Sequence, residues 1–349
     1  MRDKLVCSDN QFGYRAGSGT DMCIFAFKEI VSHYRRLNTP IYICFIDVKS
    51  AFDRVSHWKL FNKLLDRGVS KPIVSMFVHW YTNQSLHVTW GEAVSERFHM
   101  SNGIRQGAVA SPYFFNVVFD SLNQDLNASG VGCHIGFKIT NNLSWADDLV
   151  LITPSVHALR DLLTVCDRFA DENLVIYNTK KTKCMLVKSK KCVINTIPNV
   201  KLSGQTLEFV SKFKYLGHII CNTLSDNEDI FNQNRKLCAR GNRLGRKYKA
   251  ANVQVKKCLF QTFCSNIYCM TLWSSFTVAS TGTFTVNYNN VLRRMLNLPS
   301  YCSASDMLAH LGSRGYREMQ RFACHSIIER LNRSENSIII ALIHSDARM

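Results

Sequence analysis

Residues 143–152 read Leu-Ser-Trp-Ala-Asp-Asp-Leu-Val-Leu-Ile and place two adjacent acids, Asp147 and Asp148, between two short apolar strands. Neighbouring residues of a strand point to opposite faces, so a continuous strand would bury one of the two acids. A tight turn at the doublet leaves both near the surface at one edge of a sheet. The stretch therefore predicts a hairpin whose turn carries two carboxylates.

A third acid, Asp47, ends the apolar and β-prone run 41–46. If that strand neighbours the hairpin, three carboxylates converge and repel one another unless cations neutralise them. Mg²⁺ prefers oxygen ligands, and two metal ions about 3.5–4 Å apart stabilise both the attacking and the leaving oxygen of a phosphoryl transfer. The alternative is ordinary turn chemistry, in which Asp is common, so the surrounding sequence has to decide.

Five segments follow one another along the chain, and two of them contain these acids. They are 45–55 (FIDVKSAFDRV), 103–112 (GIRQGAVASP), 145–148 (WADD), 178–182 (NTKKT) and 213–217 (FKYLG). In order and spacing they resemble the five palm motifs of reverse transcriptases from non-LTR retrotransposons. Residues 11–15 (QFGYR) are similar to the finger segment of the same family, and residues 292–307 to its region beyond the thumb.

The resemblance implies a role for each matching acid. Asp47, Asp147 and Asp148 match the metal-binding aspartates of the palm, with Asp47 and Asp147 as the more direct ligands. The implied cofactor is a pair of Mg²⁺ ions, for which Mn²⁺ is a possible substitute.

The nucleotide-binding residues follow from the first two motifs. Phe52 matches the steric gate, a bulky ring that rejects a 2′-hydroxyl by clash, although the same residue suits an ordinary core. Gln106 and Gly107 match a loop that lies against the incoming nucleotide, and Arg105 is expected to contact phosphate.

The remaining motifs supply a general acid and contacts to the nucleic acid. Lys181 matches the lysine that protonates the pyrophosphate leaving group. Trp145 stands where the family usually has Tyr or Phe, and it either presses on the primer end or fills core. The primer grip is matched by Tyr215, Leu216 and Gly217.

Charge is distributed unevenly in this 349-residue chain of net charge +17. Residues 1–150 carry 15 basic and 13 acidic side chains, whereas residues 151–349 carry 28 and 13. No acid occurs from 230 to 305, where one cationic stripe has helical spacing: Lys236, Arg240, Arg243 and Lys247. A stripe without balancing acids favours a helix along a template–primer backbone over a merely solvated face.

The composition also limits location and partners. Hydrophobic residues make up 46% of the chain, which argues against global disorder. No apolar run is long enough to span a bilayer, the start lacks the apolar core of a signal peptide, and the 14 cysteines contain no C-x-x-C pair. We expect an intracellular protein, in nucleus or cytoplasm, that binds an RNA template, a DNA primer and deoxynucleoside triphosphates but no membrane. Protein partners are not indicated.

The expected fold is α+β: an antiparallel palm sheet with helices on one face, partial fingers and a helical thumb. The expected borders are 1–40 for the fingers, 41–220 for the palm with a finger hairpin at about 71–102, and 221–349 for the thumb and C-terminal region. The resemblance starts within the fingers, so we interpret the chain as N-terminally truncated. The first hypothesis is an RNA-directed DNA polymerase, and the second is an inactive retroelement remnant that still binds nucleic acid. A nucleotidyl cyclase palm is a third, disfavoured by Gln106-Gly107, Phe52 and the cationic stripe.

Overall fold

The computed structural model describes residues 2–189 and 198–346, which form two compact units. The first comprises residues 1–210 and 336–349, and the second comprises residues 211–335. The segment 213–217, predicted as part of the palm, falls in the second unit, whereas residues from 336 onward, predicted with the thumb, fall in the first. Polymerase subdomains are defined by function rather than by compactness, so the predicted borders stay predictions.

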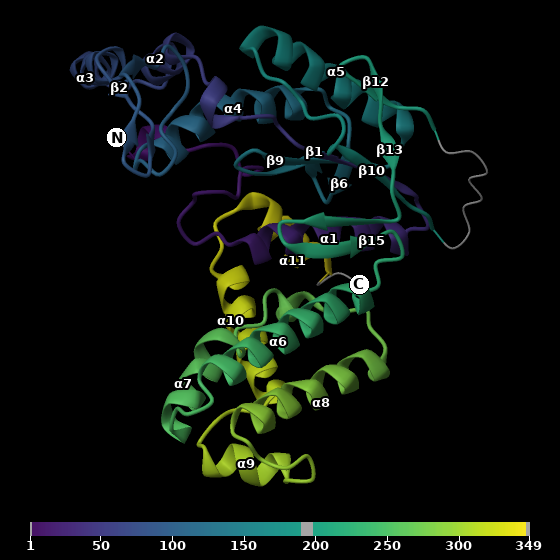
Figure 1. Cartoon of the computed structure of the whole chain (residues 1–349). Helices are drawn as coiled ribbons and strands as arrows, with labels where there is room; N and C mark the ends of the chain where they lie inside the picture. The colour runs from purple at the N-terminus through teal and green to yellow at the C-terminus, as the bar shows by residue number, and fades with distance from the viewer. Residues whose placement is uncertain (1, 190–197, 347–349) are drawn as a thin grey trace. The chain divides into compact units, whose positions relative to one another are not determined.

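A mixed sheet of five strands organises the described part of the first unit (Figure 1). In spatial order its strands are β13 (Glu208–Phe209), β10 (Lys183–Val187), β1 (Ile41–Ile46), β9 (Asp148–Thr153) and β8 (Asn142–Trp145). All neighbours are antiparallel except β10 and β13. Every residue of β1 is buried, as expected for a central strand covered on both faces.

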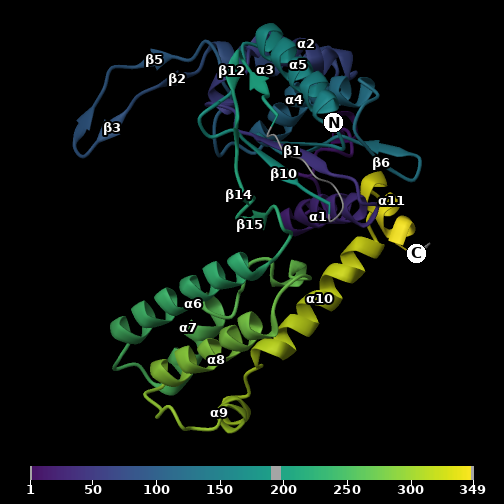
Figure 2. The ribbon, with the colours of Figure 1, turned by 90° about the vertical axis from the view of Figure 1, so that its right-hand side faces the viewer.

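Helices cover both faces of this sheet. The helices of the unit are α1 (Thr20–Arg36), α2 (His57–Asp66), α3 (Lys71–Thr82), α4 (Ser111–Ala128), α5 (Val156–Asn173) and α11 (Ser337–Asp346). Figure 2 shows α4 and α5 on one side of β1 and β10, and α1 with α11 on the other. The α+β fold is confirmed, but the sequence predicted helices on one face only. The second layer includes a helix from the far end of the chain, which local patterns do not reveal.

The first unit also contains short strands and 3-10 helices outside the five-stranded sheet. They are η1 (Arg2–Leu5), η2 (Phe52–Arg54), β2 (Ser85–Leu86), β3 (Thr89–Trp90), β4 (Ala93–Val94), β5 (Phe98–His99), β6 (Cys133–Ile135), β7 (Lys138–Thr140), β11 (Lys201–Leu202) and β12 (Gln205–Thr206). Strands β2 to β5 form the predicted hairpin, with Gly91 at its tip at φ +61°. Figure 2 shows this hairpin protruding from the unit.

Apolar spacing and helix-capping residues in the sequence predict three helices, near 21–37, after Ser56 and from Ser111. The structure confirms them as α1, α2 and α4. The apolar run Leu174–Tyr177 predicts a strand, and this prediction is wrong. Leu174 ends α5 in the left-handed region, and within the run only Tyr177 makes a bridge, to Val48. Leu174 and Ile176 are exposed and only Tyr177 is buried, so this short apolar run is a surface connection anchored by Tyr177.

The second unit is a small hairpin followed by helices. Its elements are β14 (Lys212–Tyr215), β15 (His218–Cys221), α6 (Asn227–Lys247), α7 (Val253–Phe263), η3 (Met270–Leu272), α8 (Val278–Met295), α9 (Ala304–His310) and α10 (Tyr316–Asn332). Helices α6 and α8 approach so closely that a Cβ on Gly241 would lie 2.2 Å from Cγ1 of Val291. Gly241, a poor helix former, is therefore required by packing. No described helix of either unit is long and apolar enough to cross a membrane.

Candidate functional site

Strand register brings Asp47 to the acidic doublet. Ile46 pairs with Leu149, so the same register extended by one residue sets Asp47 opposite Asp148. Trp145 pairs with Asp148 across the hairpin, which leaves Ala146 and Asp147 at the tip. The turn therefore lies one residue earlier than predicted. We call residues 145–148 the acidic turn, and Asp47, Asp147 and Asp148 the carboxylate triad.

The carboxylates of the triad repel one another. Partial desolvation, followed by repulsion from Asp147 and Asp47, raises the pKa of Asp148 to about 6. Desolvation and the charge of Asp47 also raise the pKa of Asp147, although its own main-chain N–H opposes the shift. In the described ranges 2–189 and 198–346, no Lys or Arg forms an ion pair with Asp147 or Asp148. A cation held between these oxygens would relieve the repulsion.

The donors of the triad suit a hard divalent cation, because all are carboxylate oxygens. Among the described residues, however, no three His, Cys, Asp or Glu side chains are already arranged as a metal-binding group. The triad is thus an open edge of carboxylates rather than a closed cage.

The fourth motif is fastened directly to Asp47. The main-chain N–H of Asn178 donates to the carbonyl of Asp47 at 2.8 Å, and the N–H of Asp47 donates to Oγ1 of Thr182 at 3.2 Å. Nζ of Lys181, a largely exposed side chain, lies 4.0 Å from Oδ2 of Asp47. The structure therefore brings Lys181 to the triad.

The second motif is anchored to the first through main-chain contacts. The N–H of Ile104 donates to the carbonyl of Phe52 at 2.9 Å, and a Cβ on Gly103 would lie 2.8 Å from the carbonyl oxygen of Asp53. The partly buried ring of Phe52 stacks on Phe115 of α4 with centroids 4.5 Å apart. Close by in sequence, three predicted nucleotide-binding residues form an exposed loop: Arg105, Gln106 and Gly107.

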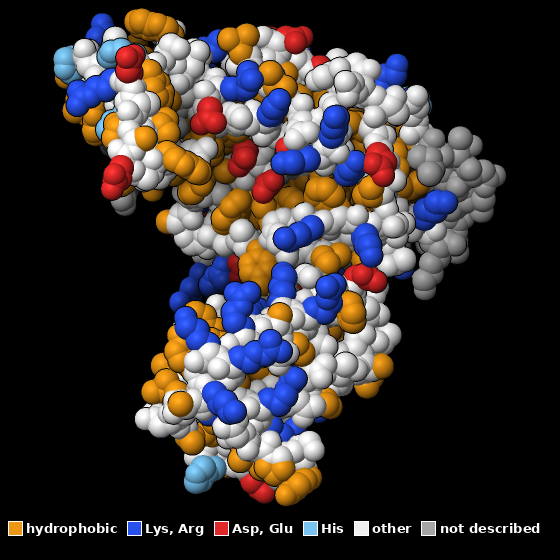
Figure 3. All heavy atoms as spheres, in the orientation of Figure 1, with side chains coloured by type: hydrophobic (Ala, Val, Ile, Leu, Met, Phe, Trp, Pro, Cys, Tyr) orange, Lys and Arg blue, Asp and Glu red, His pale blue; other side chains and the backbone are white. Residues whose placement is uncertain are grey.

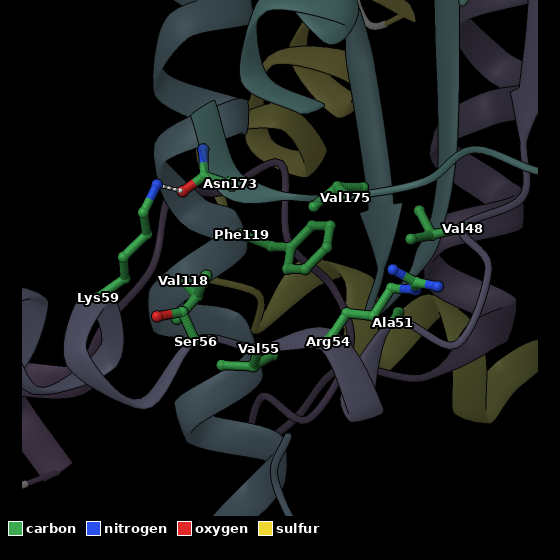
Figure 4. Close-up of a pocket in the computed structure, with 10 residues that line it drawn as sticks. All are labelled: Val48, Ala51, Arg54, Val55, Ser56, Lys59, Val118, Phe119, Asn173 and Val175. Atoms are coloured by element: carbon green, nitrogen blue, oxygen red, sulfur yellow. Dashed lines mark hydrogen bonds between the residues drawn. The ribbon is translucent and has the colours of Figure 1, made fainter. Parts of the chain in front are cut away.

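The loop that follows β1 rests on a filled core. Figure 4 shows the ring of Phe119 between Val55 and Val175, and Lys59 hydrogen-bonded to Asn173. The cavity left among these residues is about 10 Å³, which is roughly the space of one water molecule. This packing supports the loop carrying Phe52 and leaves no room for a ligand beneath it.

Three predicted primer-contacting residues lie in the second unit. Tyr215 is buried, and the hydroxyl of Tyr268 donates to the carbonyl of Leu216 at 2.5 Å. Gly217 adopts φ +86°, and a Cβ there would meet the Tyr268 ring at 3.1 Å. The turn of this hairpin therefore needs a glycine. Trp145, by contrast, belongs to the first unit and is half-buried within the acidic turn.

The four residues of the cationic stripe on α6 differ in their exposure. Arg243 and Lys247 are exposed, whereas Lys236 and Arg240 are half-buried, and Arg240 donates to the carbonyl of Phe263 at the end of α7 at 2.9 Å. Figure 3 shows Lys and Arg side chains gathered over one face of the second unit, with few acids among them.

Sequence reasoning missed residues on both units. Arg235 and Arg246 are also exposed on α6, and their helical spacing to one another was the available signal. Gln11 belongs to the finger segment and has no predicted role, yet it contacts the main chain of the acidic turn. Only its place in a family motif pointed to it, because a buried polar residue leaves no periodic pattern.

Residues 3–220 match the family described as reverse transcriptase (RNA-dependent DNA polymerase). The chain belongs to this family. Among its relatives, the Retrovirus-related Pol polyprotein of the type-2 retrotransposable element R2DM from Drosophila melanogaster is 28% identical over 56% of this chain and 20% of its own length. The corresponding polyprotein of a type-1 element R2 from Popillia japonica is 24% identical over 95% of this chain and 48% of its own length.

The chain spans half or less of the length of these relatives. Among solved structures, apo telomerase from Candida tropicalis is similar, with 13% identity, a TM-score of 0.44 and coverage of 98% of this chain and 59% of that one. The family assignment rests on the sequence match over residues 3–220.

Proposed function

We propose that this chain is the polymerase portion of a non-LTR retrotransposon protein and copies an RNA template into DNA. In the reaction, the 3′-hydroxyl of a DNA primer attacks the α-phosphorus of a deoxynucleoside triphosphate. A new phosphodiester forms, and the bond to pyrophosphate breaks. The observation that carries the proposal is the strand register, which pairs Ile46 with Leu149 and so sets Asp47 beside the doublet Asp147-Asp148 in a chain of this family.

The triad would hold the metal ions. Asp47 and Asp147 are the more direct ligands and Asp148 supports them, since all three lie at one sheet edge. Partial burial, and then the charge of the neighbouring carboxylates, raises the pKa values of Asp147 and Asp148, and a bound cation would offset both effects. Two bound Mg²⁺ ions, or Mn²⁺ in their place, supply charge stabilisation at the attacking and leaving oxygens. The side chains fix where that charge sits.

Lys181 acts as the general acid. Its ammonium lies beside Asp47 and is largely exposed, so it reaches the leaving pyrophosphate without first being desolvated. Lys181 donates its proton to the pyrophosphate oxygen, the proton of the attacking 3′-hydroxyl passes to solvent, and Lys181 then recovers a proton from solvent. Such a positioned acid typically contributes about 10²–10⁴-fold in rate.

Phe52 and the exposed loop select the nucleotide. The Phe52 ring is held by its stack on Phe115, and a fixed ring rejects a 2′-hydroxyl by clash. Gln106 and Gly107 lie against the base pair, and Arg105 contacts phosphate. Gly107 adopts φ +86°, so its backbone approaches the nucleotide without a side chain in between.

Contacts to template and primer come from both units. Trp145 contacts the primer end, and Tyr215, Leu216 and Gly217 form the primer grip. The stripe on α6 follows the phosphates, and its exposed members, Arg243 and Lys247, contribute most of the salt-dependent affinity. Domain roles follow: residues 1–40 and the hairpin within 71–102 are fingers, the rest of 41–220 is palm, and 221–349 is thumb and C-terminal region.

Primer extension tests the proposal. The protein is given an RNA template, a DNA primer, deoxynucleotides and Mg²⁺, beside Asp147→Asn and the exposed control Asp171→Asn on α5. Asp147→Asn is expected to lose extension by on the order of 10³-fold or more, because several kcal/mol of charge stabilisation disappear. The control keeps its activity. No extension by the wild type, with duplex binding retained, supports the inactive remnant instead.

Duplex binding in the same samples tests the α6 contacts. Arg243→Gln with Lys247→Gln should weaken binding and lower the slope of log affinity against log salt by about two. The paired control is Arg317→Gln with Arg321→Gln, exposed on α10 of the same unit. An unchanged slope in the α6 variant rules out these phosphate contacts.

A further inference from the structure

Gln11 holds both main-chain polar groups of the residue that precedes Asp147. Its side chain is 1% exposed. Oε1 accepts hydrogen bonds from the N–H of Ala146 and the N–H of Gly13, both at 2.9 Å. Nε2 donates to the carbonyl of Ala146 at 3.5 Å. The buried side-chain amide of Gln11 therefore holds the acidic turn by hydrogen bonds to its main chain.

The conformation of the acidic turn depends on such hydrogen bonds. Ala146 adopts φ +55°, a left-handed conformation that an L-residue with a side chain adopts only when its surroundings over-determine it. The two acids that follow are adjacent, and the strand register sets them beside Asp47, so their negative charges repel. Without a partner for Ala146, both backbone strain and charge repulsion would favour another shape of the turn.

The chain segment that carries Gln11 is itself fixed in place. The N–H of Phe12 donates to the carbonyl of Ser144 on β8 at 2.8 Å. Nδ2 of Asn116, on α4, donates to the carbonyl of Gly13 at 2.9 Å. A Cβ on Gly13 would lie 2.6 Å from the nitrogen of Ala146, so a side chain here would force the main chain of the acidic turn to shift.

We propose that Gln11 is a positioning residue that sets the geometry of the Asp147-Asp148 doublet through the main chain of Ala146. It touches neither substrate nor metal. Its partners fix the conformation from which both carboxylates project, and so fix their separation from Asp47. This inference rests on the proposed function of the triad as a cation site.

Two variants disturb the contact between Gln11 and Ala146 in different ways. Gln11→Met keeps the volume of the side chain and removes all three hydrogen bonds. Gly13→Ala keeps the hydrogen-bonding groups and crowds the nitrogen of Ala146. The matched control is Thr153→Val, which removes a buried hydroxyl bonded to the carbonyl of Tyr42 at the far end of β9.

Mn²⁺ affinity, measured by electron paramagnetic resonance, is the deciding readout. Gln11→Met and Gly13→Ala should each weaken Mn²⁺ binding by about 10–100-fold, the usual effect of removing a group that orients metal ligands. Their turnover should fall by a similar factor while KM for the deoxynucleotide stays near the wild-type value. Thr153→Val should bind Mn²⁺ with the affinity of the wild type, even if its free energy of unfolding in urea falls as much as that of Gln11→Met or Gly13→Ala.

The outcomes separate the two proposals. If the wild type binds Mn²⁺ but does not extend primers, the proposed activity fails and the role of Gln11 is still decided by the affinities. If Gln11→Met folds and binds Mn²⁺ like Thr153→Val, the positioning role is overturned. Should Gln11→Met not fold, Gly13→Ala decides by the same comparison. Should the wild type bind no Mn²⁺, both proposals fall.

Discussion

Two clusters of acidic side chains in this molecule have opposite electrostatic character. In the first unit, the triad contains Asp147 and Asp148, whose pKa values are raised. In the second unit, the buried ring of His218 lies 3.0 Å from Oδ2 of Asp229 and 3.5 Å from Oδ1 of Asp226. Burial opposes the charge of Asp229, but hydrogen bonds from neighbouring groups outweigh it and lower its pKa.

The second cluster, which we call the His218 network, is satisfied by donors. Asp229 accepts from Nε1 of Trp273 at 2.9 Å and from the N–H of Ile219 at 3.1 Å. Asp226 accepts from the main-chain N–H groups of Ser274 and Ser275 at 2.8 and 2.9 Å. The difference teaches how to separate structural from functional acids: acids matched by donors stabilise the fold, and acids left unmatched at an edge are available to a cation.

The largest expected change in stability comes from removing a carboxylate of the His218 network. Asp229→Ala should lower the free energy of unfolding by about 3–5 kcal/mol, because it leaves a buried His and two donors without their carboxylate. Urea unfolding followed by tryptophan fluorescence measures it. Mn²⁺ affinity of the folded variant should equal that of the wild type. A loss below about 1 kcal/mol would show that the network is not structural.

A smaller effect, with the opposite sign, is expected from the triad. The pKa of Asp148 is raised to about 6 in the folded protein. Protonated Asp148 therefore stabilises the folded, metal-free protein relative to the unfolded chain, and this stabilisation is lost as pH rises from about 4 through about 6. Asp148→Asn should therefore stabilise the metal-free protein at pH 7.5, by about 1 kcal/mol or less since the charge is exposed and screened. At pH 3.5 the gain should largely vanish. A gain independent of pH would contradict a raised pKa of Asp148 in the folded protein.

For Asp229 the pH dependence runs the other way. A lowered pKa in the folded protein stabilises it above pH 3.8, and this contribution is lost as pH falls through the folded value. Urea midpoints of wild type and Asp229→Asn, taken across the same pH range, should therefore converge in acid. For Asp148→Asn and wild type the midpoints also converge in acid, but with the variant as the more stable protein at neutral pH.

How much of this followed from the sequence depends on how local each signal is. The buried run 41–46 and the flanked doublet predicted strands and an acidic hairpin, and the structure confirms both because apolar pattern and turn chemistry are local. The approach of Lys181 to Asp47 was implied by motif order alone. The packing of α11 against α1 and the hydrogen bonds of Gln11 to Ala146 were not predictable, since each joins residues more than a hundred positions apart.

Helical spacing does not show which charged side chains also contribute to packing. Arg240 is predicted to contact phosphate, and its guanidinium also donates to the carbonyl of Phe263. Gly241, which weakens a helix by propensity, is required by the approach of Val291. Such pairings are set by the tertiary fold and leave no mark in helical spacing.

The most direct test of the central claim is a Mn²⁺ titration of the wild type, Asp147→Asn and Asp229→Asn at pH 7.5, followed by electron paramagnetic resonance. The triad as a cation site predicts that wild type and Asp229→Asn bind Mn²⁺ with the same affinity and that Asp147→Asn binds at least about tenfold more weakly. Equal affinities of wild type and Asp147→Asn would contradict it.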